Sequence, residues 1–401
     1  MHFRVIVFLG YIPKKVRIMN ELRKFVAPEF VFGEGALSFV GRYARNFGAL
    51  KVLVVSDPGV IAAGWCRKVV DNLEQAGIPS VVFSDVSPNP RAGQVMKGAE
   101  FYLGNGCDVI VAVGGGSVMD CAKGIGIVST NGDHILSFAG IDNVPVPGPP
   151  LICIPTTAGT SADVSQFAII TDPDERLKLA IISKTVVPDV ALIDPATTLT
   201  MDLNLTACTG LDALVHAIEA FVSSAHAPLF DLHALQAIRL IRNNLLAVLS
   251  DPDNIELRSQ LMLASLEAGL AFSNASLGAV HAMAHSLGGY LDLPHGECNA
   301  ILLDHVMSFN RPEVEERYGE ICEALGIDIR GMNAKDKFKA VLNEIIALKR
   351  AAGISNTLAD KGARSSDISE LARKAIKDPC MVTNPRRANQ RDIEVIYEEA
   401  L

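Results

Sequence analysis

The chain has 401 residues, 49% hydrophobic and 20% charged, a composition typical of a folded protein and not of a disordered one. Its 36 Lys and Arg residues against 45 Asp and Glu residues give a net charge of −9, which argues against general binding to nucleic acid or to an anionic membrane. This length predicts two domains or one large one.

The cysteines and the N-terminus bear on where the protein is found. The eight cysteines are far apart and form no CxxC pair, which predicts reduced, mostly buried thiols and a cytoplasmic protein. The apolar run near the N-terminus is followed by Pro13, Lys14 and Lys15 without a small-residue cleavage site, so we expect no signal peptide, and Met19 is an alternative start. The longest stretch without a charged residue, 268–291, could span a membrane by length alone. It contains two histidines, an asparagine and several glycines, which favour a buried helical region.

In chain order, the first half alternates short apolar strands with helical segments. Strands are predicted at 51–56, 81–83, 108–113 and 151–154, and helices at 65–76, 95–105 and 118–127. Continuous Val and Ile runs are typical of strands covered on both faces, as in a parallel sheet with right-handed βαβ crossovers. The proline-rich segment 144–150 predicts a loop.

From Leu203 onward the pattern changes to long helical segments with few strand candidates. We therefore predict an α/β domain over residues 1–200 and an all-helical domain over residues 201–401. The boundary is expected within 198–203.

A glycine-rich turn, Gly114-Gly115-Gly116-Ser117, lies where the third predicted strand ends and a helix begins. Glycine allows a tight turn and close approach of a ligand, and the free N–H groups at a helix N-terminus attract anions such as a pyrophosphate. The turn is not a GxGxxG motif, and it does not follow the first strand as in the usual dinucleotide fold. A tight turn without a ligand remains the alternative.

Other strand ends carry further candidates for cofactor contacts. Asp57 follows strand 51–56, where its carboxylate could bind the ribose of NAD and repel the 2′-phosphate of NADP; the alternative is a helix N-cap. Segment 87–90 is either a turn or a cofactor-facing loop. The hydroxyl-rich segment 155–160 suits phosphate or a nicotinamide amide, or caps a helix.

The most informative segment is TGLDALVHAIEAF, residues 209–221. As a helix, it places its three ionisable side chains, Asp212, His216 and Glu219, on one narrow stripe, while the remainder is apolar or small. A helix that is apolar nearly all round is buried. A buried carboxylate needs a partner, because an unpaired buried charge costs several kcal/mol.

Two further segments supply histidines. His281 and His285 lie one helical turn apart, and His295 lies between Pro294 and Gly296 on a predicted turn. With His216 these make four candidate imidazoles, and three of them in neutral form together with the Asp212 carboxylate would suit Fe²⁺ or Zn²⁺. The alternative for each histidine is a hydrogen-bonded core residue. Cys298, close to His295, is interpreted as a buried thiol in preference to a soft ligand.

In combination these motifs resemble the iron-containing (group III) alcohol dehydrogenase family, from about residue 20 to the C-terminus. The resemblance is carried, in family order, by GGGSVMDCAKGIGI, IPTTAGTSADV, PDVALIDP, TGLDALVHAIEAF, GAVHAMAHSLGGYLDLPHGECNAILLDHVMSFN and NPR. It implies an N-terminal α/β dinucleotide-binding domain with a parallel sheet, an all-α C-terminal domain and an active-site cleft between them. Residues 1–18 have no counterpart, and residues 159–163 read GTSAD where the family usually has GTGSE.

The resemblance also implies roles for individual residues. It makes Asp212, His216, His281 and His295 the metal ligands and puts His285 beside the nicotinamide as a proton relay. It assigns to the cofactor the residues Asp57, Asn89, Gly115, Gly116, Ser117, Asp120, Thr156, Thr157, Ser165 and Lys178.

The expected function is therefore reversible hydride transfer between a primary alcohol or aldehyde and NAD(H), with Fe²⁺ or Zn²⁺ bound and NADP disfavoured. Family resemblance implies a homodimer or larger homo-oligomer. The alternatives are a relative of glycerol dehydrogenase or maleylacetate reductase, or a regulatory protein that binds cofactor and metal without turnover.

Overall fold

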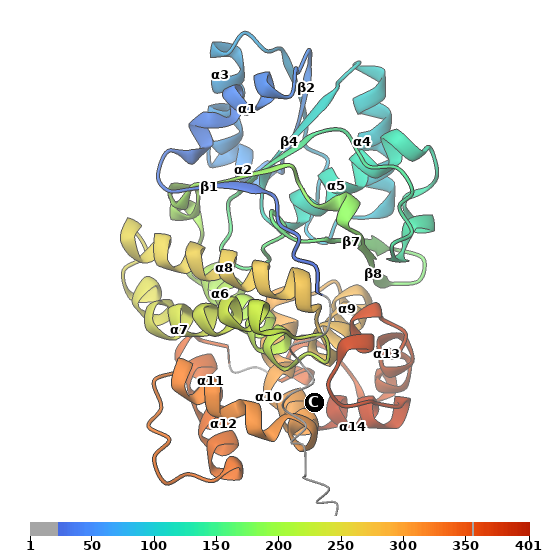
Figure 1. The fold of residues 1–401 in the computed structure, drawn as a ribbon. Helices are drawn as coiled ribbons and strands as arrows, with labels where there is room; N and C mark the ends of the chain where they lie inside the picture. Colours follow the sequence, from blue (N-terminus) through green and yellow to red (C-terminus); the bar gives the residue numbers. More distant parts are fainter. Residues whose placement is uncertain (1–22, 355–356) are drawn as a thin grey trace, which may run out of the picture.

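The computed structural model describes residues 23–354 and 357–401, so the expectations for residues 1–18 lie outside the described residues. Figure 1 shows two layered parts, with the sheets and their helices above and a helical assembly below. The chain passes from one to the other after the 3₁₀ helix η6 (Pro195–Thr200), and α6 begins at Leu203. This is the α/β plus all-α architecture expected from the sequence.

The larger sheet has six parallel strands in the order β1-β9-β6-β4-β2-β3. Their bounds are β1 (Glu29–Phe32), β2 (Val52–Val55), β3 (Ser80–Phe83), β4 (Val109–Gly114), β6 (Leu151–Pro155) and β9 (Val190–Ile193). The four predicted strands are confirmed as β2, β3, β4 and β6. Because β1 precedes them, the glycine-rich turn follows the fourth strand of the chain and not the third.

Helices cover both faces of this sheet, which explains the continuous apolar strands. In β2, Leu53 and Val55 belong to the cluster packed with α4 and α5, while Val52 and Val54 belong to the cluster packed with α1 and α3. Successive side chains of a strand point to opposite faces, so a strand buried on both sides must be apolar at every position. The helices of this part are α1 (Val40–Asn46), α2 (Pro58–Ala62), α3 (Trp65–Gln75), α4 (Ala92–Gly104) and α5 (Gly116–Asn131), with 3₁₀ helices η3 (Ala36–Phe39), η4 (Ile135–Phe138) and η5 (Lys184–Val186).

A second, three-stranded sheet was not predicted. It has the order β5-β8-β7 and consists of β5 (Gly140–Ile141), β7 (Phe167–Asp172) and β8 (Leu177–Ile182), with β7 and β8 antiparallel. This hairpin lies between the large sheet and the helical part (Figure 1). It thereby brings Phe167 and Lys178 to the junction of the two parts.

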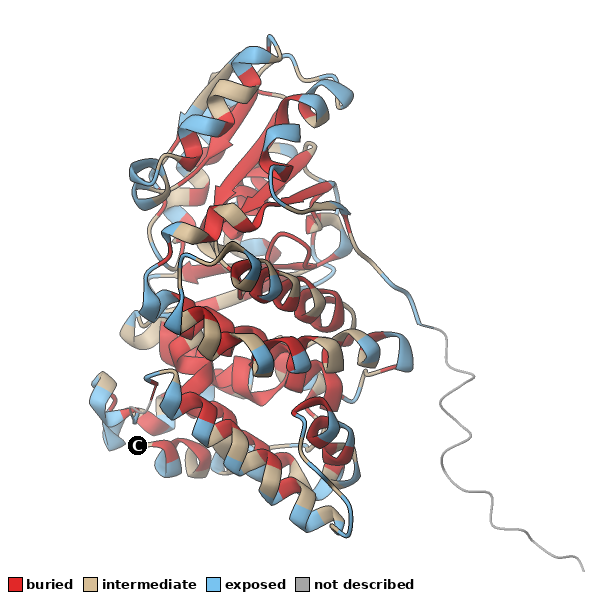
Figure 2. Cartoon of the chain, turned by 90° about the vertical axis from the view of Figure 1, so that its left-hand side faces the viewer, coloured by how far each residue is buried: buried red, intermediate tan, exposed pale blue. Residues whose placement is uncertain are grey.

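The described residues from 201 onward form helices and no strand. The α-helices are α6 (Leu203–Val222), α7 (Pro228–Ser250), α8 (Ile255–Ala275), α9 (Ala279–Leu291), α10 (His295–Val314), α11 (Tyr318–Ala324), α12 (Ala334–Ala351), α13 (Ile368–Ala375) and α14 (Gln390–Ala400). Short 3₁₀ helices are η7 (Glu315–Arg317), η8 (Ala359–Lys361), η9 (Ser365–Asp367) and η10 (Pro379–Thr383). Figure 2 shows buried residues along the strands and along the central helices, and one hydrophobic cluster joins residues of β7 and β9 to those helices.

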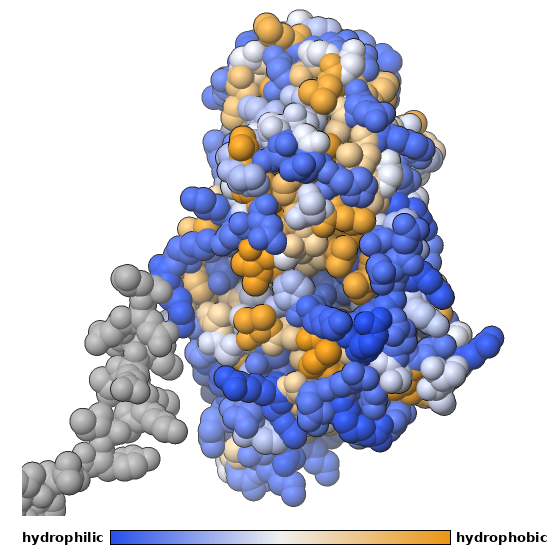
Figure 3. All heavy atoms as spheres, turned by 90° about the vertical axis from the view of Figure 1, so that its right-hand side faces the viewer, coloured by the Kyte–Doolittle hydropathy of each residue, from blue (hydrophilic) through white to orange (hydrophobic). Residues whose placement is uncertain are grey.

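The charge-free stretch 268–291 is divided between two helices. Ser276, with φ 61°, ends α8, and α9 begins three residues later. Among the described helices, α6 alone is long and apolar enough to cross a membrane, and 94% of that window is buried inside the protein. On the face in Figure 3, apolar side chains form patches separated by hydrophilic ones. All eight cysteines are free and buried, as predicted.

Candidate active site

Four side chains from three helices converge at the junction of the two parts. Asp212 and His216 come from α6, His281 from α9 and His295 from the first turn of α10. One potential ligand atom of each lies within 4.8 Å of those of the others. The side chains of Asp212 and His281 are each only 1% exposed.

The position of His295 corrects the sequence analysis. Pro294 and Gly296 suggested a turn, but Pro294 is the N-cap of α10 and His295 is its first residue. Gly296 is required for close packing: a Cβ there would lie 2.5 Å from the carbonyl oxygen of Cys208 on α6. Glycine at this position therefore lets α10 approach α6, which brings His295 next to Asp212.

The imidazoles of this cluster are kept neutral by burial. Burial lowers the pKa of His216 to about 4 and that of His281 to about 3, and it lowers the pKa of His295 well below its usual value. Neutral imidazole is the form that binds a metal ion. The cluster therefore offers one carboxylate and three neutral nitrogen donors at physiological pH.

Several polar atoms at this point lack hydrogen-bond partners within the described structure. They are Asp212 Oδ2, His216 Nδ1, His295 Nδ1 and Asn299 Oδ1, all buried. Buried polar groups are nearly always paired, because leaving one unpaired costs about 1–3 kcal/mol. Asp212 belongs to the four converging side chains, and an unpaired carboxylate oxygen there fits a divalent cation such as Fe²⁺ or Zn²⁺.

Three further residues hydrogen-bond to the cluster or to His285 beside it; Glu219 was recognised from the sequence on the stripe of Asp212 and His216, but Asn299 and Asp378 were not. Asn299 Nδ2 lies 2.7 Å from Asp212 Oδ1, 3.0 Å from His281 Nε2 and 3.2 Å from His295 Nε2. Glu219 Oε2 lies 2.6 Å from His281 Nδ1. Asp378 Oδ2 lies 2.9 Å from His285 Nδ1. Helical spacing did indicate Glu219, one turn after His216, and could have indicated Asn299, one turn after His295; no local pattern indicates Asp378.

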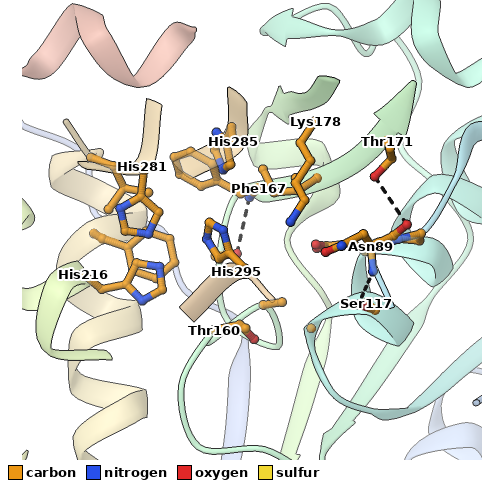
Figure 4. A pocket seen from close by; sticks show the side chains of 18 residues that line it. Asn89, Ser117, Thr160, Phe167, Thr171, Lys178, His216, His281, His285 and His295 are labelled. Carbon is orange, nitrogen blue, oxygen red and sulfur yellow. Dashed lines mark hydrogen bonds between the residues drawn. The ribbon is translucent and has the colours of Figure 1, made fainter. Parts of the chain in front are cut away.

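His285 lies beside the cluster and not in it. Its ring stacks on that of His295 with centroids 5.3 Å apart and an interplanar angle of 12°. It lines the same pocket as His216, His281 and His295 (Figure 4). Since Asp378 engages Nδ1, the other ring nitrogen, Nε2, remains available for proton exchange.

The wall next to the cluster is apolar. The Phe272 ring stacks on His216 at a centroid distance of 4.2 Å, and Phe167 meets Phe272 edge-on at 5.6 Å. Ile169 and Leu277 also line this pocket. A small apolar group adjoining the cluster would therefore be shielded from water.

The opposite wall comes from the sheet side. Of the predicted cofactor residues, those that line the pocket are Asn89, Gly116, Ser117, Asp120, Ser165 and Lys178. Figure 4 shows the Lys178 amino group pointing into the space between His295 and Asn89. Ser117 Oγ accepts a hydrogen bond from the Asn89 backbone N–H at 3.2 Å, which ties the loop after β3 to the start of α5.

The remaining predicted cofactor residues, Asp57, Gly115, Thr156 and Thr157, do not line the pocket. A Cβ on Gly115 would lie 3.2 Å from Thr157, and one on Gly116 would lie 2.8 Å from Thr160, so the glycine-rich turn and the segment after β6 are in close contact. Thr156 is buried beside them. Asp57 is the N-cap of α2 and accepts a hydrogen bond from Val60 N–H at 2.9 Å, which was its predicted alternative role.

Buried charges on the sheet side have perturbed pKa values. Burial raises the pKa of Asp120 to about 7, and burial lowers the pKa of Lys178. Asp163, in the segment that departs from the family pattern, has its pKa raised to about 6 by burial. In that segment Ser161 has a left-handed backbone with φ 49°, and its hydroxyl donates to Ser265 O at 2.6 Å.

Comparisons with known proteins agree with this geometry. The sequence pattern "Iron-containing alcohol dehydrogenase" matches residues 27–195, and "Fe-containing alcohol dehydrogenase family, C-terminal" matches residues 206–401. The chain is 40% identical over 371 residues to a 1,3-propanediol dehydrogenase of Citrobacter freundii, which covers 92% of this chain and 96% of that protein. It is 37% identical over 380 residues to an NAD-dependent methanol dehydrogenase of Bacillus methanolicus, over 94% of this chain and 99% of that one.

Solved structures give the same result. The crystal structure of a 1,3-propanediol oxidoreductase superposes with a TM-score of 0.92 at 38% identity, covering 95% of this chain and 100% of that one. An alcohol dehydrogenase from Oenococcus oeni also gives a TM-score of 0.92, at 36% identity over 95% of this chain and 100% of that one. The chain belongs to the iron-containing alcohol dehydrogenase family, and it is an NAD(H)-linked oxidoreductase that interconverts alcohols and aldehydes.

Proposed function

We propose that Asp212, His216, His281 and His295 hold the catalytic Fe²⁺ ion and that the nicotinamide of NAD(H) lies in the pocket between them and the glycine-rich turn. The observation that carries this proposal is the convergence of four ligand atoms within 4.8 Å on the wall of a pocket whose other wall is the start of α5. The enzyme then oxidises a primary alcohol to its aldehyde, or catalyses the reverse reaction.

The metal supplies Lewis acidity when it is bound, which lowers the pKa of an alcohol hydroxyl. The contribution of the chain is to fix the geometry. Asp212, His216, His281 and His295 would hold the ion at one end of the pocket, and Phe272 and Leu277 exclude water from the carbon that loses hydride. The start of α5 binds the pyrophosphate through its free N–H groups, so C4 of the nicotinamide can face the same carbon.

His285 carries the hydroxyl proton out of the pocket. Its Nδ1 is held by Asp378 at 2.9 Å, which leaves Nε2 as the nitrogen that accepts and releases the proton. His285 is 1% exposed, so the proton must pass through the pocket or along a chain of water.

The nature of the pocket indicates the substrate class and the cofactor. The phenylalanine rings and Leu277 next to the proposed ligands favour a primary alcohol with a short apolar chain.

The cofactor preference rests on Asp57, after β2, which favours NAD over NADP because its carboxylate would repel a 2′-phosphate. The net charge of −9 supports a protein without nucleic acid or membrane partners, and eight free thiols support a cytoplasmic location. By family resemblance we infer a homodimer or larger homo-oligomer.

Elemental analysis of protein purified without oxygen, combined with a panel of primary alcohols, tests the function. We expect about one equivalent of Fe²⁺ or Zn²⁺ per chain and NAD-linked oxidation of at least one short alcohol. His281→Ala should abolish both metal content and turnover, whereas His305→Ala, on α10 but outside the cluster, should keep both. Wild-type turnover by His281→Ala would disprove the ligand assignment. Retained metal and NADH without oxidation of any alcohol would favour a regulatory protein.

A further inference from the structure

Glu219 is a buried acid on α6 that lies outside the proposed ligand set. Its side chain is 4% exposed, and both carboxylate oxygens lie within hydrogen-bond distance of groups on α9. Oε1 accepts from the backbone N–H of Val280 at 2.7 Å, and Oε2 lies 2.6 Å from His281 Nδ1. Glu219 therefore connects α6 to the helix that carries a ligand.

We propose that Glu219 is a positioning residue that keeps the proton of His281 on Nδ1 and thereby leaves the Nε2 lone pair free to bind the metal. This rests on the proposed function, in which His281 is a ligand. A ligand imidazole commonly donates its outer N–H to a carboxylate, which fixes the ring orientation and the tautomer and raises the basicity of the other nitrogen.

The geometry distinguishes the two nitrogens of His281. Nδ1 faces Glu219, whereas Nε2 lies 4.0 Å from Asp212 Oδ1 and 3.0 Å from Asn299 Nδ2. Nε2 is thus the nitrogen on the side of the ligand cluster. By contrast, His216 Nδ1 and His295 Nδ1 have no hydrogen-bond partner in the described structure. Of the three proposed imidazole ligands in the described structure, His281 is therefore the one whose tautomer is set by a carboxylate.

The hydrogen bond from the Val280 backbone N–H also holds the Glu219 carboxylate in place. Val280 is in the first turn of α9, where N–H groups have no partner within the helix, and the N-cap Gly278 has no side chain to supply one. Oε1 of Glu219 fills that role, which fixes the carboxylate between the helix end and His281. An ionised carboxylate has only acceptors, so Oε2 accepts a hydrogen bond from the Nδ1–H of His281.

Replacement by glutamine would reverse this pattern without changing the shape of the side chain. If the amide oxygen keeps the Val280 bond, the amide nitrogen faces His281 Nδ1 as a donor, and the histidine proton must move to Nε2, where the metal binds. If the amide flips, its NH₂ group meets the Val280 N–H, and its oxygen accepts from His281 Nδ1–H but, being uncharged, does not raise the basicity of Nε2 as a carboxylate does. Both arrangements therefore weaken metal binding, the first by moving the proton to Nε2 and the second by removing the charge next to Nδ1.

The test is metal affinity, measured by competition of Fe²⁺-loaded protein with a chelator in the absence of oxygen. We expect Glu219→Gln to bind Fe²⁺ about 10- to 100-fold more weakly than the wild type. An affinity within about twofold of the wild type would overturn the proposal. If Glu219→Gln does not fold, Glu219→Asp takes its place: the shorter acid should lose part of the affinity, and a wild-type value would again overturn the proposal.

Asn384→Ala is the matched control. Asn384 Oδ1 accepts from Ala279 N–H at 3.0 Å, so it holds the same helix end without touching His281. We expect lower stability but unchanged metal affinity. An equal loss of affinity in Asn384→Ala and Glu219→Gln would mean that helix position, and not the tautomer, is responsible, and would overturn the proposal. If His281→Ala keeps its metal, the ligand assignment itself fails, which is a distinguishable outcome.

Discussion

Asp212→Asn should make the metal-free protein more stable while removing its stabilisation by metal. Asp212 is 1% exposed; Asn299 donates to Oδ1, and Oδ2 has no hydrogen-bond partner in the described structure. Asparagine has nearly the same shape and can keep the bond from Asn299 with its oxygen. The substitution removes a buried charge among neutral imidazoles, so we expect the metal-free free energy of unfolding to rise by about 1–3 kcal/mol.

The magnitude can be converted into a melting temperature. At about 2.1 cal/mol/K per residue, 401 residues give an unfolding entropy of about 0.8 kcal/mol/K. The expected gain without metal is therefore roughly 1–4 °C. Free metal at about 100 times its dissociation constant stabilises the wild type by about 2.7 kcal/mol, or about 3 °C, and should not stabilise the variant. When metal is added, the melting temperature of the wild type is thus expected to approach or exceed that of the variant.

Thermal unfolding of both proteins, with and without Fe²⁺ under anaerobic conditions, measures these shifts. Asp231→Asn is the control, because the Asp231 carboxylate, 15% exposed, lies outside the ligand cluster and pairs with Arg317 at 2.8 Å and with His226 at 3.1 Å. That variant should be less stable than the wild type, and its melting temperature should rise as much on addition of metal as that of the wild type. A metal-free Asp212→Asn protein that melts below the wild type, or that gains the same shift with metal, would refute the reasoning.

Three other substitutions test the cofactor and proton-transfer residues and one buried acid. Asp57→Ser keeps an acceptor for the Val60 N–H but removes the charge, so NADPH-linked kcat/KM should rise; no gain would exclude Asp57 from cofactor selection. Asp378→Asn should lower kcat by up to about 100-fold and alter its pH profile while metal content is kept, because His285 Nδ1 loses its carboxylate; an unchanged profile would contradict the relay. Burial raises the pKa of Asp163 to about 6, so its folded form binds a proton more tightly and its contribution to stability is lost as pH rises from about 4 to about 6. Chemical unfolding of Asp163→Asn at several pH values should lack this loss, and an identical pH dependence would contradict it.

The central strands could be predicted from the sequence because both faces of the sheet are covered. A run such as 108–113 has no polar alternation, and this identified β4 directly. The outer strand β1 has only four residues, all exposed or half-buried, and its apolar run is too short to identify. The β7–β8 hairpin was missed because its pairing depends on a turn at 173–176, which carries no glycine; Arg176 takes the left-handed conformation there, with φ 47°.

The site could be predicted only where its spacing is local. Asp212 and His216 are one turn apart in a helix that is apolar elsewhere, and this pattern indicates a shared buried partner. His281 and His295 point to the same place because α9 and α10 pack against α6. Sequence spacing does not predict this packing, so their common site was predicted from the family resemblance. Asp378 reaches His285 from 93 residues further along the chain, so no periodic pattern could reveal it.

The arrangement of the strands explains why the strand ends with proposed cofactor residues face the proposed metal ligands. The neighbouring strands β6, β4 and β2 are parallel, so their carboxyl ends lie along one edge of the sheet. Asp57, Gly115 and Thr156 each follow one of these strands, and ligands of open α/β sheets bind at this edge. The helices α6, α9 and α10 present their ionisable side chains to the same pocket. Because each half provides one reactant site, substitutions on the sheet side should change cofactor affinity with metal content intact, and substitutions in the helices should do the reverse.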